Sequence, residues 1–138
     1  MIGIVLTGHG SFAPGMLSSV ELITGEMKQI QVVTFNEDQD LLQKQLEKAI
    51  AEVNTGSGVV CFTDLAGGTP FNVCAKIAAA MDDVKVIGGT NSPMLLSGFF
   101  QRESSLDEFV EKVLNEGKSN IKQFLAKKKV SETAEDGI

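Results

Sequence analysis

The segment GVVCFTDLAGGTP, residues 58–70, decides the fold. Its first part, residues 58–63, is a mostly apolar run rich in β-branched side chains, which is typical of a strand buried on both faces of a parallel sheet. Asp64 follows at once. After a turn of small residues, Thr69 is placed to cap a helix and Pro70 to be its first residue. The segment therefore predicts a strand, a tight turn and a helix that ends near Met81.

The rest of the chain repeats this alternation. Apolar runs predict further strands at residues 2–6, 31–35 and 84–87. We expect helices from Ala13 or Pro14 to Gly25, from a cap at Asn36 or Asp38 to Val53, from Asn91 or Ser92 to Phe100, and from Ser105 to Gly117. Residues 119–125 fit either a last strand or a continued helix. This order predicts an α/β fold, a doubly wound parallel sheet with strand order 2-1-3-4 and helices on both faces.

Length and composition limit the function classes. A chain of 138 residues fits one domain, and 43% apolar with 22% charged residues is a globular balance. The net charge of −6 argues against a nucleic-acid partner or an anionic membrane surface. No apolar run approaches the ~20 residues that span a bilayer. The opening residues MIGIVLTGHG do not follow the signal-peptide pattern.

The few metal-binding and redox side chains indicate no metal site and no cofactor. We expect Cys61 and Cys74 to be buried packing residues in a chain from a reducing compartment. His9 is the one histidine, whereas zinc sites usually combine several His or Cys ligands. No GxGxxG or GxxxxGK[ST] motif supports nucleotide binding.

Three features meet at the point where the predicted strand order reverses. His9 lies three residues past the end of the first predicted strand, and Asp64 lies at the end of the third. Gly67, Gly68 and Thr69 open the following helix, whose free N–H groups favour an anion. We therefore expect an imidazole, a carboxylate and an anion cradle at one crevice.

The chemistry of this group favours phosphoryl transfer. A carboxylate on Nδ1 fixes the imidazole tautomer and leaves a lone pair on Nε2, so that His9 is a nucleophile or a general base. Beside an anion cradle, a nucleophilic histidine attacks a phosphoryl group. The general-base alternative needs a nucleophile such as Ser11, and no G-x-S-x-G elbow is present. A third reading makes His9 structural, in a non-catalytic anion-binding module.

At these residues the sequence resembles the IIA domain of the mannose-type sugar phosphotransferase system. The resemblance lies in residues 2–10 with the His-Gly pair, in DLAGGTPFN at 64–72 and in GTNSPML at 89–95. It covers residues 1–126, which we take as the IIA domain, followed by a polar tail at 127–138. A related phosphocarrier subunit of a dihydroxyacetone kinase shares the fold and the histidine, but GGTPFN favours the sugar-transport branch.

The resemblance implies a cytoplasmic, homodimeric phosphocarrier and protein histidine phosphotransferase. His9 would accept a phosphoryl group from the carrier HPr and pass it to a histidine of a IIB component, and membrane components IIC and IID would be contacted only indirectly. Asp64 would orient the imidazole, and Thr69 would contact the phosphoryl oxygens. Leu65 replaces a polar residue of some members, which leaves only its backbone N–H for phosphate. The family exchanges a last strand between subunits, which favours a strand at 119–125.

Both partner proteins must reach His9, so we expect an apolar rim around it. The candidates come from the three loops and their helices: Phe12, Met16, Phe71 and Met94.

Overall fold

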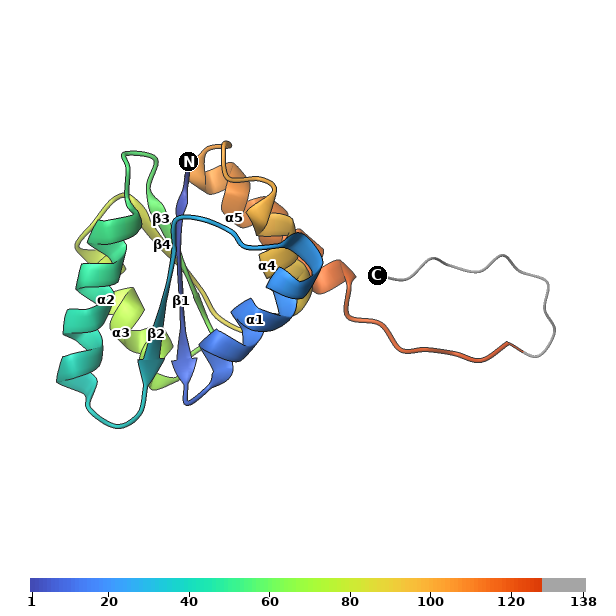
Figure 1. Cartoon of the computed structure of the whole chain (residues 1–138), viewed down its shortest axis with the longest axis horizontal. Helices are drawn as coiled ribbons and strands as arrows, with labels where there is room; N and C mark the ends of the chain where they lie inside the picture. Colours follow the sequence, from blue (N-terminus) through green and yellow to red (C-terminus); the bar gives the residue numbers. More distant parts are fainter. Residues whose placement is uncertain (128–138) are drawn as a thin grey trace.

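The computed structural model of the protein describes residues 1–127, in which strands and helices alternate (Figure 1). The strands are β1 (Gly3–His9), β2 (Ile30–Phe35), β3 (Val59–Thr63) and β4 (Val84–Ile87). The helices are α1 (Phe12–Thr24), α2 (Gln39–Val53), α3 (Thr69–Ala79), α4 (Ser92–Phe99) and α5 (Leu106–Ser119). The predicted α/β class is confirmed. The predicted tail at 127–138 lies outside the described residues, Lys127 excepted.

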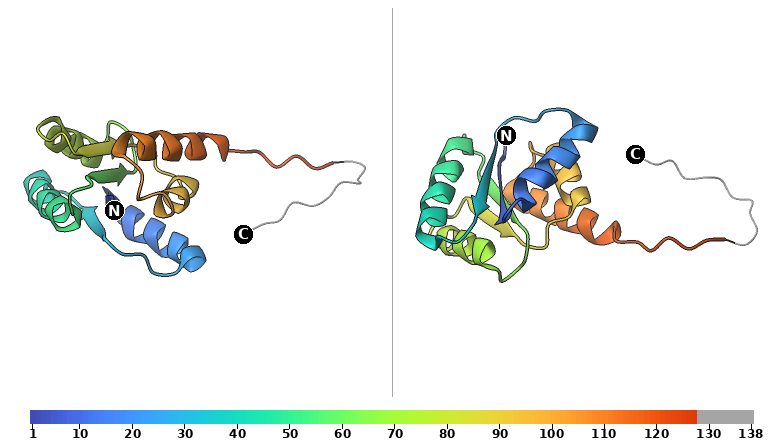
Figure 2. Two further views of the ribbon diagram at one scale, coloured as in Figure 1. Left: turned by 90° about the horizontal axis from the view of Figure 1, so that it is seen from above. Right: turned by 60° about the horizontal axis from the view of Figure 1, so that its bottom comes forward.

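The strands form one parallel sheet in the predicted order, β2-β1-β3-β4. Helices α2 and α3 cover one face, and α1, α4 and α5 cover the other (Figures 1 and 2). The carboxyl ends of β1 and β3 are neighbours because these strands pair directly, with Thr7 opposite Thr63. The two predicted site residues are thereby brought to the same edge of the sheet.

The alternation of side chains along the strands divides the core into two layers. In β1, Ile4 and Leu6 face α1, α4 and α5, whereas Val5 faces α2 and α3, and all three are fully buried. The apolar stripe predicted for α2 is buried as well, at Leu42, Leu46, Ala49, Ile50 and Val53. Apolar periodicity therefore identifies the core-facing side of this helix correctly.

Strand β1 is longer than predicted. The sequence prediction ends it at Leu6, but pairing continues through Gly8 opposite Thr34 and His9 opposite Phe35. The Gly10 N–H then donates to the Phe35 carbonyl at 3.0 Å. Pairing with β2 thus carries a polar, glycine-containing segment on as strand. His9 is the last strand residue, not a loop residue.

Helix starts follow the predicted caps with one exception. The side chains of Asp38, Asn91 and Ser105 each accept a hydrogen bond from the first turn of their helices. At α3 the predicted cap at Thr69 is wrong, because Gly68 takes the extended capping conformation and Thr69 is already helical. The Thr69 hydroxyl is therefore not used as a cap.

Gly117 does not end the last helix, as the sequence suggested. It lies inside α5 and is buried against Met94 of α4, so close that a Cβ at this position would overlap the methionine side chain. Met94 itself is only 4% exposed. The glycine is therefore needed for a close helix–helix contact.

The described residues after α5, 121–127, form neither strand nor helix in this single chain. Residues 121–127 leave the body of the domain (Figure 1). The apolar side chains of Ile121, Phe124 and Leu125 are 75%, 88% and 69% exposed. The strand expected at 119–125 is therefore not formed within one chain, because α5 continues to Ser119 and no strand of the same chain reaches the segment.

A buried arginine lies at the amino ends of β1 and β2, at the end of the sheet away from His9 and Asp64. The Arg102 guanidinium, in a residue only 4% exposed, donates to the backbone carbonyls of Ile2, Lys28 and Gln29 at 2.9, 2.6 and 2.7 Å. These carbonyls precede β1 and β2, so one side chain ties both strand starts to the α4–α5 connection. Burial lowers the pKa of Arg102.

We predict that Gly3→Ala destabilises the domain. A Cβ on Gly3 would overlap the backbone carbonyl of Val53 and lie 2.7 Å from its Cγ2 atom, so the backbone must shift. We expect the free energy of unfolding in urea to fall by about 1–3 kcal/mol.

The matched control is Gly15→Ala in α1, where a Cβ meets nothing within 4 Å. It should raise stability by about 0.5–1 kcal/mol. Equal effects of the two changes would contradict this account.

Candidate functional site

His9 occupies the carboxyl end of β1 and is partly open to solvent, with 47% of its side chain exposed. Its ring contacts Phe35 of β2 edge to face, with centroids 5.6 Å apart and planes at 79°. Sequence reasoning missed Phe35, because only the pairing of β1 with β2 brings the two rings together.

Asp64 holds this histidine at two atoms. Its Oδ2 accepts the His9 backbone N–H at 2.8 Å and lies 2.7 Å from the ring Nδ1, while its Oδ1 accepts the Leu65 N–H at 2.8 Å. Burial favours the neutral carboxyl, but the hydrogen bonds from His9 and Leu65 outweigh it and lower the pKa of Asp64. An ionised carboxylate only accepts, so Nδ1 carries a proton, and in the neutral imidazole Nε2 then has the lone pair.

Glycine at position 8 makes this approach possible. A Cβ there would lie 3.0 Å from the Asp64 Cγ and 2.7 Å from Cδ2 of Phe12. Any larger residue would push the carboxylate away from His9. The glycine before the histidine is thus part of the site.

The turn between β3 and α3 fixes its own backbone. The Gly68 N–H donates to the Leu65 carbonyl at 2.9 Å, and the Asn72 side chain donates to the Gly67 carbonyl at 3.0 Å. The Leu65 N–H, which was expected to contact phosphate, donates to the Asp64 carboxylate in this structure.

The N–H groups of Ala66 and Gly67 have no hydrogen-bond partner within residues 1–127, and further free donors lie at the start of α3. Within residues 1–127, the N–H groups of Thr69 and Phe71 and the Thr69 hydroxyl have no hydrogen-bond partner, and Pro70 carries no N–H. A Cβ on Gly68 would lie 3.2 Å from Cε1 of His9, so the imidazole lies directly over the turn. The histidine and a helix start with free N–H groups, of the kind that favours anions, are therefore neighbours.

The residues predicted to form an apolar rim differ in exposure. Phe12, Met16 and Phe71 are half-buried. Met94, also predicted for this rim, is only 4% exposed and lies against Gly117. Leu65 was expected only as a backbone ligand, yet its side chain is 63% exposed beside His9. An apolar residue in a turn of otherwise small residues was the signal for it.

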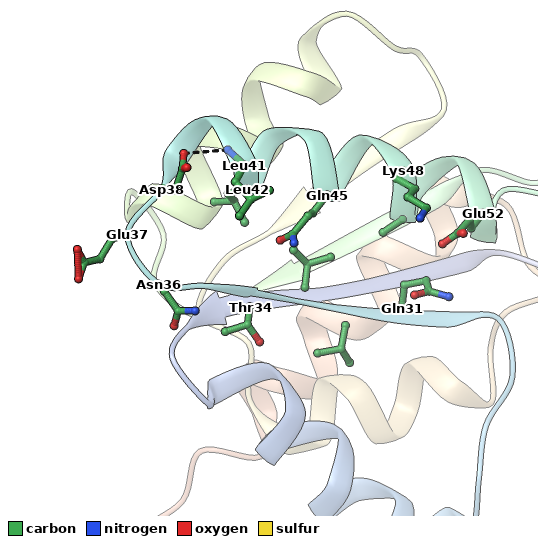
Figure 3. A pocket seen from close by; sticks show the side chains of 13 residues that line it. Gln31, Thr34, Asn36, Glu37, Asp38, Leu41, Leu42, Gln45, Lys48 and Glu52 are labelled. Atoms are coloured by element: carbon green, nitrogen blue, oxygen red, sulfur yellow. Dashed lines mark hydrogen bonds between the residues drawn. The ribbon is translucent and has the colours of Figure 1, made fainter.

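Two grooves on the described part of the surface lie away from His9. A groove of about 420 Å³ runs between α2 and the outer edge of β2, where Gln31, Gln45 and Lys48 are among the lining residues (Figure 3). An apolar groove of about 550 Å³ lies between α1, α4 and α5. Neither is lined by His9 or Asp64. The candidate site is an open surface, which suits a macromolecular partner.

The predicted packing role of the cysteines is confirmed. Cys61 and Cys74 are both free and fully buried. A hydrogen bond with Cys74 and burial raise the pKa of the Cys61 thiol, which opposes reactivity.

Comparisons with known proteins identify the family. The family model EIIA-man, described as "PTS system fructose IIA component", matches residues 3–114. The chain belongs to this family of sugar phosphotransferase system IIA components. It is 30% identical to the fructose-specific EIIA component of Bacillus subtilis, over 75% of this chain and 72% of the relative. It is also 31% identical to the mannose-specific EIIAB component of Escherichia coli K12, over 91% of this chain. The chain spans only 40% of that relative's length.

Solved structures agree with this assignment. The EIIA component from Streptococcus agalactiae superimposes with a TM-score of 0.82 at 30% identity, covering 89% of this chain and 97% of that structure. A mannose/sorbose-specific IIA subunit from Enterococcus faecalis gives 0.83 at 23% identity, over 94% and 98%, and supports the fold alone. In residues 1–127, no helix has both the length and the apolar character needed to cross a bilayer.

We predict that Asp64 makes stability depend on acid pH. Its pKa is lower in the folded chain than in the unfolded chain, where it is about 3.9. The carboxylate therefore stabilises the fold fully above that value, and the contribution is lost as pH falls through the folded pKa. The unfolding free energy of wild type minus that of Asp64→Asn should shrink between about pH 5 and pH 2. A difference that is constant or grows in acid would contradict this.

Proposed function

We propose that this IIA component is a phosphocarrier that accepts a phosphoryl group from phospho-HPr on His9 and passes it to a histidine of a IIB component. One observation supports this above the others: Nδ1 of His9 lies 2.7 Å from the Asp64 carboxylate, which leaves Nε2 as the nucleophile. In the proposed setting the chain works in the cytoplasm, with membrane components contacted only through IIB.

In the proposed step, the Nε2 lone pair of His9 attacks the phosphorus of the donor phosphohistidine. A new N–P bond forms while the donor's N–P bond breaks, and the donor nitrogen keeps that electron pair. Positive charge develops on the imidazole and is stabilised by the Asp64 carboxylate, which holds the Nδ1 proton. The Thr69 hydroxyl and the N–H groups at the start of α3 would stabilise the phosphoryl oxygens. Gly67 and Gly68 would allow the backbone to approach them.

The acceptor part of the proposal is supported by a relative's name. The matching protein of E. coli is named an EIIAB component, which joins a IIA with a IIB part. Offering the phosphorylated chain a purified IIB protein or a dihydroxyacetone kinase would separate the two possible acceptors.

We predict that the chain gains one acid-labile phosphoryl group when it is incubated with phosphoenolpyruvate, enzyme I and HPr. Intact mass spectrometry should show the gain in wild type and none in His9→Ala, because that variant lacks the nucleophile. In Asp64→Asn the rate should fall by about 10²–10⁴-fold, since the amide provides no negative charge opposite the developing imidazolium.

A control IIA protein must be phosphorylated in the same mixture. Phosphorylation of His9→Ala, or no gain in wild type beside an active control, would overturn the proposed function.

We also propose that two chains form a homodimer by exchanging the segment after α5. Residues 121–127 carry three exposed apolar side chains, and β4 is an edge of the sheet whose outer side can accept another strand. An antiparallel strand from a second copy would cover both.

We predict that replacing Ile121, Phe124 and Leu125 together by Ser yields a folded monomer. Sedimentation velocity should show a dimer for wild type and for the control Leu41→Ser, which removes a half-exposed leucine from α2 on the opposite face. A triple variant that sediments like wild type would contradict strand exchange.

A further inference from the structure

Leu65 is an exposed apolar side chain in the loops that meet at His9. Among residues 1–127, most other strongly exposed large apolar residues lie far along the chain from these loops, at the end of α1 or α4 or after α5. Leu65 follows Asp64 directly and is 63% exposed. Exposing a leucine there costs hydration free energy in the free protein, which is recovered when a partner covers it.

The backbone of Leu65 is held in place on both sides. Its N–H donates to the Asp64 Oδ1 at 2.8 Å, and its carbonyl accepts the Gly68 N–H at 2.9 Å. The backbone of such a fixed turn loses little further conformational freedom on binding. Rigid display of this kind favours a binding hot spot.

Leu65 and His9 flank one backbone position. A Cβ on Gly68 would lie 3.2 Å from Cε1 of His9 and 3.4 Å from Cβ of Leu65. A protein that brings its own phosphohistidine to Nε2 of His9 must therefore extend its surface over Leu65. A small phosphorylated molecule would not need to.

We propose that Leu65 is the apolar anchor of the docking surface, and that its partner is a phosphohistidine-bearing protein with an apolar side chain or pocket beside that histidine. The inference rests on the proposed function and adds which residue binds the donor. The local hydrogen bonds agree with this role. The N–H of Leu65 already donates to Asp64, and the Leu65 side chain has no polar atom. Leu65 can therefore take part in docking but not in the phosphoryl chemistry.

The test measures phosphoryl transfer from phospho-HPr to wild type, Leu65→Ala and Leu22→Ala over a range of chain concentrations. Leu22 is the matched control, because it is 88% exposed but lies near the carboxyl end of α1, outside the loops that meet at His9. Leu65→Ala should raise the KM for the chain about tenfold and leave the maximal rate within about twofold. Leu22→Ala should match wild type in both.

Each other outcome overturns the inference. An unchanged KM in Leu65→Ala means that no partner covers the side chain. A fall in maximal rate at constant KM means that Leu65 acts on the site geometry. A change in sedimentation coefficient means that a second copy of the chain covers it. If wild type is not phosphorylated on His9 at all, the proposed function fails together with this inference, whereas a wild type that is phosphorylated isolates the question of Leu65.

Discussion

The site depends on the hydrogen bonds between the Asp64 carboxylate and His9. This carboxylate lies at the end of β3 and bonds the backbone and the ring of His9 at the end of β1, so it joins the two central strands where they leave the sheet. Its third hydrogen bond, from Leu65, begins the turn that leads into α3. One carboxylate thus orients the imidazole and fixes the first residue of the turn before α3. This requires the strand order β2-β1-β3-β4, because only neighbouring strands bring the two residues together.

Small residues are the second requirement, since the carboxylate can approach only where no side chain intervenes. Gly8 leaves room for Asp64, and Gly68 leaves room for the His9 ring. Gly88 does the same behind the turn, because a Cβ there would lie 2.9 Å from both the Ala66 Cβ and a ring carbon of Phe71. These three glycines serve contact distance rather than flexibility.

The sequence predicts the features that depend on local patterns. Apolar periodicity identified the buried side of α2, and the order of strands and helices predicted the sheet that brings His9 and Asp64 together. Prediction from the sequence failed where contacts between residues far apart in the chain determine the structure. The extension of β1 to His9 needs Phe35 as a partner, and Gly117 continues α5 because Met94 lies against it. The occupied N–H of Leu65 likewise follows from three-dimensional bonding and from no motif.

The hydrogen bonds that the turn makes within itself suit the proposed carrier, because they withdraw two of its N–H groups from the phosphoryl group. Transfer between two histidines breaks and forms the same kind of N–P bond, so the reaction is close to balanced only if neither site holds the phosphoryl group too strongly. Leu65 and Gly68 use their N–H groups within the turn, which leaves the Thr69 hydroxyl and the remaining backbone amides of residues 66–71 for the phosphoryl oxygens. With nearly half of the His9 side chain exposed, the group would stay accessible to a second protein. Weak retention of the phosphoryl group and recognition of the partner protein are then separate properties. The N–H groups of the turn determine the first, and the exposed side chain of Leu65 contributes to the second.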